Sequence, residues 1–181
     1  MQEQKFKVEL LKHPTEKDWE WCKICTLNTV GKKMANAPDS KWKRKILESE
    51  HSPIRELWFG FRLTIPYYIS VHLCRHGTGI NHFVQSQRND RQDNYDRTKA
   101  PQDVPVNHII SVNAQELMFM ARKRLCKQAD PLTQQVMKEM CKQTIFVCPE
   151  LEGLLEPLCS YRNGKCTEFY PCGYNKKFIK E

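Results

Sequence analysis

The chain has 181 residues, a formal net charge of +8 and a hydrophobic content of 40%, which fits a single globular domain with its own core. No apolar run approaches the roughly 20 residues that a membrane span needs, and the start of the chain lacks the layout of a signal peptide, so we expect a cytoplasmic protein with no membrane partner. The positive charge favours phosphorylated or polyanionic partners without choosing between a nucleotide and a nucleic acid.

The first part of the chain reads as a strand followed by two helices. Polar and apolar residues alternate over residues 5–11, which predicts an edge strand. Thr15 and Asp18 have the spacing of a capping box, which predicts a helix over residues 15–31. A second helix is expected over residues 41–49, where lysines face water and apolar residues pack inward.

The first of these helices carries Cys22 and Cys25 on one face. The pair has a metal-compatible spacing, but two small residues packed in a helix face explain it at least as well. The chain has nine cysteines. An odd number in a protein expected to be cytoplasmic argues against a disulfide framework.

The central part of the chain combines an apolar run with a cluster of polar groups. Residues 57–65 are rich in β-branched and aromatic side chains and predict a buried strand. A helix is expected to begin at Pro66 and to stop at Gly77. It leads to Arg75 and His76, and a polar tail follows: Gln85, Ser86, Gln87 and Arg88. Arginine pairs with phosphate and stacks on rings, so this segment suits an anionic, planar ligand, although a basic surface loop is the alternative.

Beyond this segment the composition changes twice. Residues 89–102 are charged and polar and are interpreted as a loop over a site, and residues 104–112 predict another strand. Asn113, with Glu116 three residues later, predicts a helix whose N-terminus could bind phosphate or a carbonyl. A further helix begins at Asp130.

These elements have no regular β-α-β rhythm, which predicts an α+β fold with a mixed or antiparallel sheet flanked by helices. We expect one domain over residues 1–150 and a cysteine-rich C-terminal tail over residues 151–181. Turn residues in this tail predict that Cys159, Cys166 and Cys172 lie close together, and zinc binding by these three is a hypothesis.

A motif in the central part resembles the flavin-dependent thymidylate synthases, whose pattern is Arg-His-Arg-x-x-Ser-x-Asn-x-x-Ser-x-Arg. The residues that follow its order are Ser52 ahead of the motif, then Arg75, His76, Asn81, Ser86 and Arg88. Gly77 replaces the second motif Arg, the first motif Ser is missing, and one extra residue precedes Arg88. The resemblance covers residues 50–124 and implies a short, divergent member with the fold of that family.

The resemblance implies a function as well as a fold. Enzymes of this family methylate dUMP reductively to dTMP, with methylenetetrahydrofolate as one-carbon donor, reduced FAD as hydride donor and NADPH as reductant. They use no enzyme nucleophile, and instead stabilise negative charge on the pyrimidine and hold it against the flavin. They act as homotetramers, because several subunits build each site.

The same resemblance assigns residues to roles. Arg124 is expected to be catalytic by stabilising the charged pyrimidine ring. The residues expected to bind the nucleotide are Arg75, Gln85, Ser86, Gln87, Arg88 and Arg124. Those expected to bind FAD are Ser52, Arg75, His76, Asn81, Asn113 and Ala114.

Two other interpretations stay open. Gly77 and a segment before Asn113 that is shorter than in the family favour a relative that binds a pyrimidine nucleotide with altered or no catalysis. The positive charge and the cysteines of the tail favour a basic nucleic-acid-binding protein with a metal-bound tail.

Overall fold

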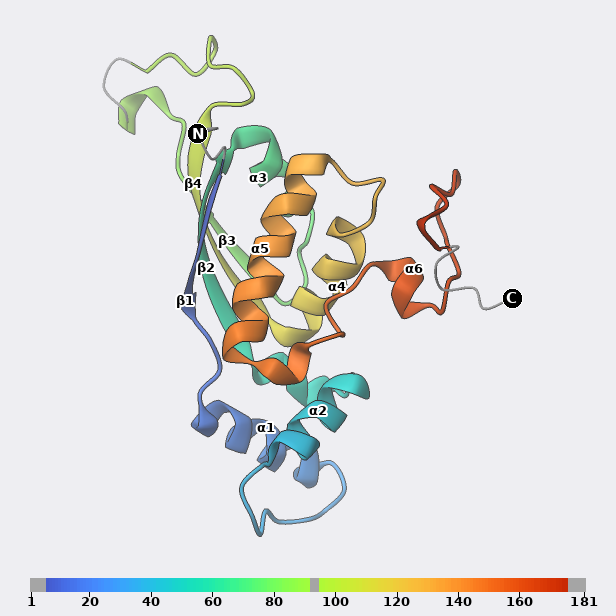
Figure 1. The fold of residues 1–181 in the computed structure, drawn as a ribbon. Helices are drawn as coiled ribbons and strands as arrows, with labels where there is room; N and C mark the ends of the chain where they lie inside the picture. The colour runs from blue at the N-terminus through green and yellow to red at the C-terminus, as the bar shows by residue number, and fades with distance from the viewer. Residues whose placement is uncertain (1–5, 92–94, 176–181) are drawn as a thin grey trace.

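A four-stranded antiparallel sheet forms the framework of the protein (Figure 1). The computed structural model describes residues 6–91 and 95–175. The strands are β1 (Lys7–Lys12), β2 (Trp58–Pro66), β3 (Ile80–Val84) and β4 (Pro105–Asn113), and they lie in the order β1-β2-β4-β3. The predicted α+β class is confirmed, and the sheet is antiparallel rather than mixed. Lys5, the first residue of the predicted N-terminal strand, lies outside the described residues.

Helices cover one face of this sheet, and Figure 1 shows α3, α4 and α5 on the same side of it. The α-helices are α1 (Glu16–Asn28), α2 (Ser40–Glu48), α3 (Tyr67–Leu73), α4 (Ala114–Arg124), α5 (Pro131–Val147) and α6 (Leu158–Tyr161). Three short 3-10 helices are η1 (Ser52–Glu56), η2 (Asn89–Arg91) and η3 (Pro149–Leu151). In the described part of the chain, no helix combines the length and the apolar character that crossing a membrane requires.

Side-chain caps fix where the main helices begin. Thr15 and Asp18 form the predicted capping box of α1, and the Asn113 side chain accepts a hydrogen bond from the Glu116 N–H at the start of α4. The Asp130 carboxylate accepts bonds from two N–H groups at the start of α5. Caps of this kind stabilise a helix by about 1 kcal/mol each, which explains why the predicted helix starts agree with the structure.

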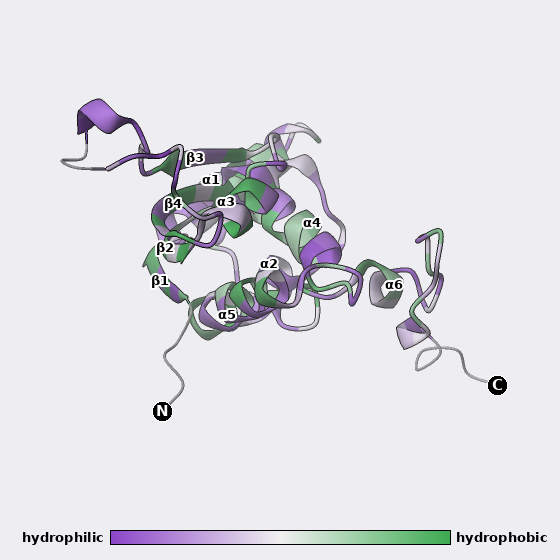
Figure 2. Cartoon of the chain, turned by 90° about the horizontal axis from the view of Figure 1, so that it is seen from above, coloured by the Kyte–Doolittle hydropathy of each residue, from purple (hydrophilic) through white to green (hydrophobic). Residues whose placement is uncertain are grey.

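The core lies between the sheet and the helices. Every second residue of β2 faces the helices and is at most 1% exposed: Phe59, Phe61, Leu63 and Ile65. In Figure 2 the segment that projects before β4 is hydrophilic, while the hydrophobic colour follows the packed elements. Burying each large apolar side chain contributes roughly 1.5–3 kcal/mol, so this row anchors the sheet to the helices.

Two elements differ from the sequence-based expectation. The edge strand β3 was not predicted, because Asn81 and His82 interrupt its apolar residues. The helix α3 ends at Leu73 with Cys74 as its cap, so Arg75 and His76 lie in the loop between α3 and β3 rather than inside the helix.

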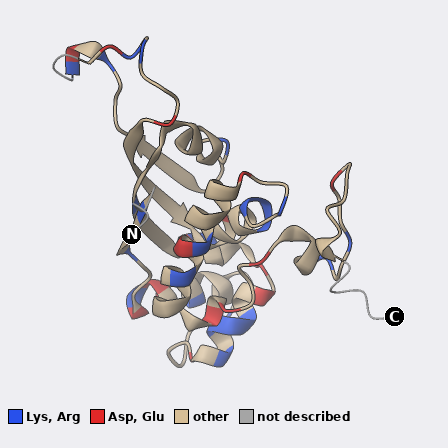
Figure 3. Ribbon diagram, turned by 45° about the horizontal axis from the view of Figure 1, so that its top comes forward, with Lys and Arg blue, Asp and Glu red and all other residues tan. Residues whose placement is uncertain are grey.

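Part of the cysteine-rich tail packs against the domain. Leu151 and Leu155 belong to the hydrophobic core, and α6 lies beside α4 in both Figure 1 and Figure 2. Figure 3 shows that charged residues are sparse along the sheet and gather on the helices and the projecting segment. The charged residues of the sheet are confined to Lys7, Glu9 and Lys12 on β1 and Arg62 on β2.

Candidate functional site

A hollow of about 670 Å³ lies along α4, from its cap Asn113 to its last residue, Arg124. The 74–79 loop after α3 forms one wall, α4 forms another, and the segment around η1 closes the third side. Its lining includes four residues that the sequence assigned to binding or catalysis: Arg75, His76, Asn113 and Arg124. The fold therefore brings together groups that are separated along the chain.

A hydrogen-bonded chain runs through this hollow from Glu116 through His76 to Arg124. The His76 ring is buried, and its Nδ1 lies 2.8 Å from the Glu116 Oε1. The Arg124 Nε–H donates to His76 Nε2 at 3.0 Å, and Arg124 Nη2 donates to the His72 carbonyl at 2.7 Å. Since an arginine N–H can only donate, Nε2 is the acceptor and the ring proton sits on Nδ1. His76 thus holds the Arg124 guanidinium in place.

The hollow has an excess of positive charge. Five cationic side chains line it against two carboxylates, Glu50 and Glu116. Both carboxylates are engaged, Glu50 by Arg122 and Glu116 by His76. Within residues 6–91 and 95–175, no ion pair links a carboxylate to the other four cations: Arg55, Arg75, Lys123 and Arg124.

Arg75 and Arg124 are close enough to influence each other. Burial, and secondly the charge of Arg75, lower the pKa of Arg124. Two guanidinium groups that repel each other form a favourable place for an anion, because the anion removes the repulsion. Phe119, which is 44% exposed and packs edge-on against the His76 ring, adds an aromatic surface. The arrangement suits an anionic ligand with a planar ring.

The sequence did not identify Arg122 as the most buried arginine of this region. Its guanidinium pairs with both oxygens of Glu50 and stacks on the Tyr161 ring, with 3.6 Å from Cζ to the ring centroid. The resemblance assigned a role to Arg124 and none to Arg122. The contact with Tyr161 on α6 joins distant parts of the chain, so local periodicity could not predict it.

The predicted nucleotide-binding residues of the motif tail line a different hollow. Gln85, Ser86, Gln87 and Arg88 border a space of about 570 Å³ beneath residues 97–102. Arg88 is exposed and makes two hydrogen bonds to the Asp90 carboxylate, at 2.8 and 2.7 Å. No residue lines both hollows. The predicted nucleotide site is thus divided within one chain, with Arg88 in one part and Arg124 in the other.

Three predicted flavin-binding residues lie outside both linings. Ser52 begins η1 at an exposed position next to the first hollow. Asn81 is exposed on β3 and pairs in register with Ser111. Ala114 is fully buried under the first turn of α4. Ser52 and Ala114 nevertheless lie next to the first hollow, because Glu50 and Arg55 near Ser52, and Asn113 and Gln115 on either side of Ala114, line it.

No protein-family model matches this chain, and a search of curated proteins found no match either. The resemblance to the flavin-dependent thymidylate synthases therefore rests on the motif residues themselves.

The cysteines singled out in the sequence do not form a compact metal site. Cys22 is fully buried in the core, and burial raises the pKa of its thiol to about 12. Among the described residues, His, Cys, Asp or Glu ligand atoms gather within 4.8 Å of one another in one group of three. Cys159, Cys166 and Cys172 do not belong to it. Burial first, and then neighbours that include Cys172 and Cys166, raise the pKa of Cys126. The tail thus folds back toward the end of α4.

Gly79 fixes the approach of the 74–79 loop to the cap of α4. Its φ is +74°, and a Cβ there would lie 2.5 Å from the Asn113 Nδ2. We expect Gly79→Ala to lower the free energy of unfolding by about 2 kcal/mol, because it strains the backbone and displaces a helix cap. Gly77→Ala is the control, since a Cβ at Gly77 meets nothing within 4 Å. Urea denaturation would measure both, and equal midpoints for the two variants would contradict the expectation.

Proposed function

We propose that this chain binds a phosphorylated, planar ligand in the hollow along α4 and acts as a divergent flavin-dependent thymidylate synthase. The observation that carries the proposal is the pair of neighbouring guanidiniums, Arg75 and Arg124, for which no ion pair with a carboxylate exists among the described residues. The motif order in the sequence adds the ligand class: FAD and dUMP, with methylenetetrahydrofolate and NADPH as further substrates.

The donors around the hollow fit an FAD pyrophosphate and a nucleotide. Arg75 and the exposed Arg55 would pair with phosphate, which arginine binds through two parallel hydrogen bonds. Bound FAD would supply the hydride for the reaction. Both ring nitrogens of His76 already have partners, so we assign His76 to positioning Arg124 rather than to direct contact with the flavin.

Arg124 would stabilise negative charge on the pyrimidine ring. Its two bonds, to His76 and to the His72 carbonyl, fix the guanidinium before a ligand arrives. Such preorganisation is what makes a charged donor effective in a transition state, because no group has to reorient as charge develops. The Glu116 carboxylate polarises the His76 ring, and this strengthens Nε2 as an acceptor for Arg124.

The division of the predicted site between two hollows supports an oligomer. If Arg88 and Arg124 bind the same nucleotide, they come from different subunits, as the resemblance to a homotetrameric family implies. The opening of each hollow toward solvent is consistent with this arrangement.

A second candidate is a relative that binds a pyrimidine nucleotide without this catalysis. The Arg88 guanidinium donates two hydrogen bonds to the Asp90 carboxylate. To bind a nucleotide phosphate, Arg88 must therefore exchange Asp90 for the phosphate. An arginine that stays paired with Asp90 would leave the nucleotide phosphate without this contact, so the bound nucleotide would not be held rigidly enough for turnover.

Flavin binding provides the first test. Purified protein incubated with FAD and passed through a desalting column is expected to keep a flavin absorption spectrum, and Arg75→Ala should weaken FAD binding about 10-fold or more, as expected for loss of one charged hydrogen bond. Arg62→Ala is the matched control, because Arg62 lies exposed on β2 outside both hollows.

Three outcomes separate the interpretations. Retained flavin together with dTMP formation from dUMP supports the enzyme. Binding of dUMP without product, measured by calorimetry, supports the second candidate. Absence of both, with tight binding to DNA or RNA that weakens steeply with salt, would overturn the proposal in favour of a nucleic-acid-binding protein.

A further inference from the structure

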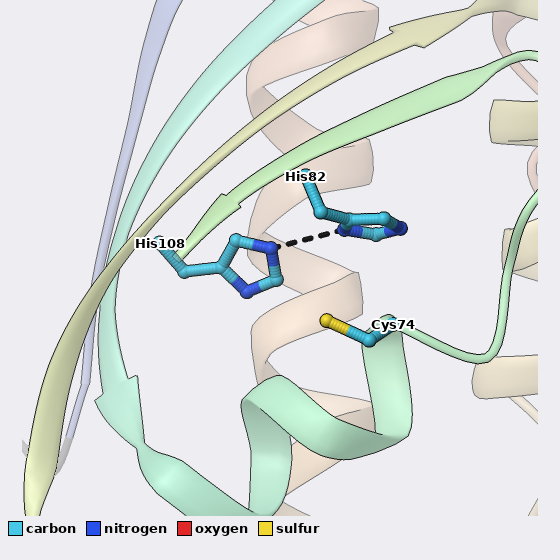
Figure 4. Close-up of side chains that lie close together, drawn as sticks. All are labelled: Cys74, His82 and His108. Carbon is cyan, nitrogen blue, oxygen red and sulfur yellow. Dashed lines mark hydrogen bonds between the residues drawn. The ribbon is translucent and has the colours of Figure 1, made fainter. Parts of the chain in front are cut away.

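Three side chains that the proposed function does not use converge behind the first hollow. Cys74 caps α3, His82 lies on β3, and His108 lies on β4, and Figure 4 shows their side chains pointing toward one another. Their ligand atoms all lie within 4.8 Å of one another. His108 is fully buried, whereas Cys74 is exposed. The cluster thus has one side in the core and one side that solvent can reach.

We propose that Cys74, His82 and His108 bind a zinc ion through one thiolate and two imidazoles. Thiolate and imidazole are the ligands that zinc prefers, and three protein ligands leave a fourth position for water.

The distances are close to those of a bound ion. The His82 Nδ1 and the His108 Nε2 lie 3.0 Å apart. Zinc–nitrogen bonds of ~2.0–2.1 Å at a tetrahedral angle separate two nitrogens by ~3.3 Å. The two rings therefore have to move apart by a few tenths of an ångström, which side-chain rotation on β3 and β4 can supply.

The outer hydrogen bonds point the correct ring nitrogens at the ion. The His82 Nε2–H donates to the His76 carbonyl at 2.9 Å, which leaves the Nδ1 lone pair facing the cluster. The Ser70 hydroxyl lies 3.1 Å from the His108 Nδ1 and also hydrogen-bonds the Cys74 thiol. Ser70 can accept from His108 and donate to the thiolate at the same time. Zinc-binding histidines commonly have outer partners of this kind, which fix the tautomer and the ring orientation.

Without an ion the same groups can still pair, with the His108 Nε2–H donating to the His82 Nδ1. In that state the Ser70 hydroxyl donates to the His108 Nδ1. In this arrangement the Cys74 thiol bonds Ser70 and makes no contact with the histidine pair, although Figure 4 shows its sulfur pointing toward both rings from the end of α3. The thiol at this place is the feature that distinguishes a metal site from a buried histidine pair.

A bound ion would also hold the loop that carries Arg75 and His76. Cys74 begins this loop, and the His82 ring bonds the His76 carbonyl. The site would therefore tie α3, β3 and β4 together directly beneath the first hollow. This role is structural, and it is independent of whether the hollow binds a nucleotide.

The test is zinc content of the full chain, purified without a metal-chelating tag and dialysed against micromolar zinc, then measured by elemental analysis. Wild type is expected to retain one zinc per chain. Cys74→Ser and His82→Asn should bind zinc roughly 100-fold more weakly or worse, and Ser70→Ala about 10- to 100-fold more weakly, because it removes an outer partner. Cobalt in place of zinc should give a sulfur-to-metal charge-transfer band that Cys74→Ser abolishes.

The controls are Cys25→Ser, His51→Asn and Cys159→Ser, none of which touches the cluster, and all three should keep the zinc. Circular dichroism checks that each variant is folded, and the exposed Cys74 makes its serine variant the least disruptive one. A wild type without zinc would overturn the proposal. So would a protein whose zinc survives both Cys74→Ser and His82→Asn but is lost in Cys159→Ser, since the tail would then hold the ion.

Discussion

Glu50→Gln is expected to lower the free energy of unfolding by about 2–4 kcal/mol, which is the range for breaking a largely buried ion pair by removing one partner, reduced for partial exposure. The Arg122 side chain is 9% exposed and Glu50 is 24% exposed. Within the described residues the Arg122 Nε has no hydrogen-bond partner, so Glu50 and the Tyr161 ring are what stabilise this buried charge. A neutral glutamine removes the compensating charge and leaves the guanidinium buried.

The backbone at this position makes the test sharper. Glu50 has a φ of +49°, in the left-handed region where glycine is favoured. Glu50→Gly relieves that strain but also removes the carboxylate. If the ion pair dominates, Glu50→Gly is less stable than wild type, and if backbone strain dominates, it is more stable. Glu152→Gln, at an exposed position, should leave the urea midpoint unchanged.

The effect of Glu50→Gln should depend on pH. Burial alone would raise the pKa of Glu50, but the hydrogen bonds and charge of Arg122 outweigh it, and the pKa is lowered. A carboxyl whose folded pKa is lowered stabilises the protein above its unfolded pKa, and this contribution is lost as the pH falls through the folded value. The gap in stability between wild type and Glu50→Gln should therefore be full at pH 7 and shrink on acidification below about 4.5. A gap that grew at low pH would contradict the ion-pair explanation.

Local patterns predicted the elements whose signals are local. Capping residues predicted the starts of α1 and α4, and the apolar run predicted β2. The edge strand β3 was missed, because a strand with one buried residue at its start has little hydrophobic alternation. Its pairing with β4 depends on register across the sheet rather than on its own composition.

The candidate site shows the same limit. The sequence placed Arg75, His76 and Arg124 in one site, and the structure brings them together around one hollow. The sequence could not show that Arg88 lines another hollow, because the path of β3 between His76 and Arg88 was unknown. Cys74, His82 and His108 were not recognised as a group, because their spacing follows no metal-binding pattern and only the fold joins them.

The resemblance and the divided site together predict large losses of activity in two distant arginine variants. Arg88→Ala should weaken dUMP binding by about 1.5–3 kcal/mol, the contribution of a charged hydrogen bond, and Arg88→Lys should recover only part, since an ammonium cannot make the forked contact. Arg124→Ala should reduce dTMP formation roughly 100- to 1,000-fold with a smaller loss of binding, because charge on the ring grows only as the reaction proceeds.

Mixing these two variants tests whether one site uses both arginines from different subunits. In hybrid oligomers formed at random from equal amounts of Arg88→Ala and Arg124→Ala, about a quarter of the sites would contain both native arginines, so activity should return to about a quarter of that of wild type. Neither variant alone, treated in the same way, should recover. If a single chain supplied both arginines to one site, or if the hollows served separate ligands, the mixture would stay as inactive as its parts. A different outcome is that both the hybrids and wild type bind dUMP but form no dTMP. This would support the shared pocket and exclude thymidylate synthesis as its reaction.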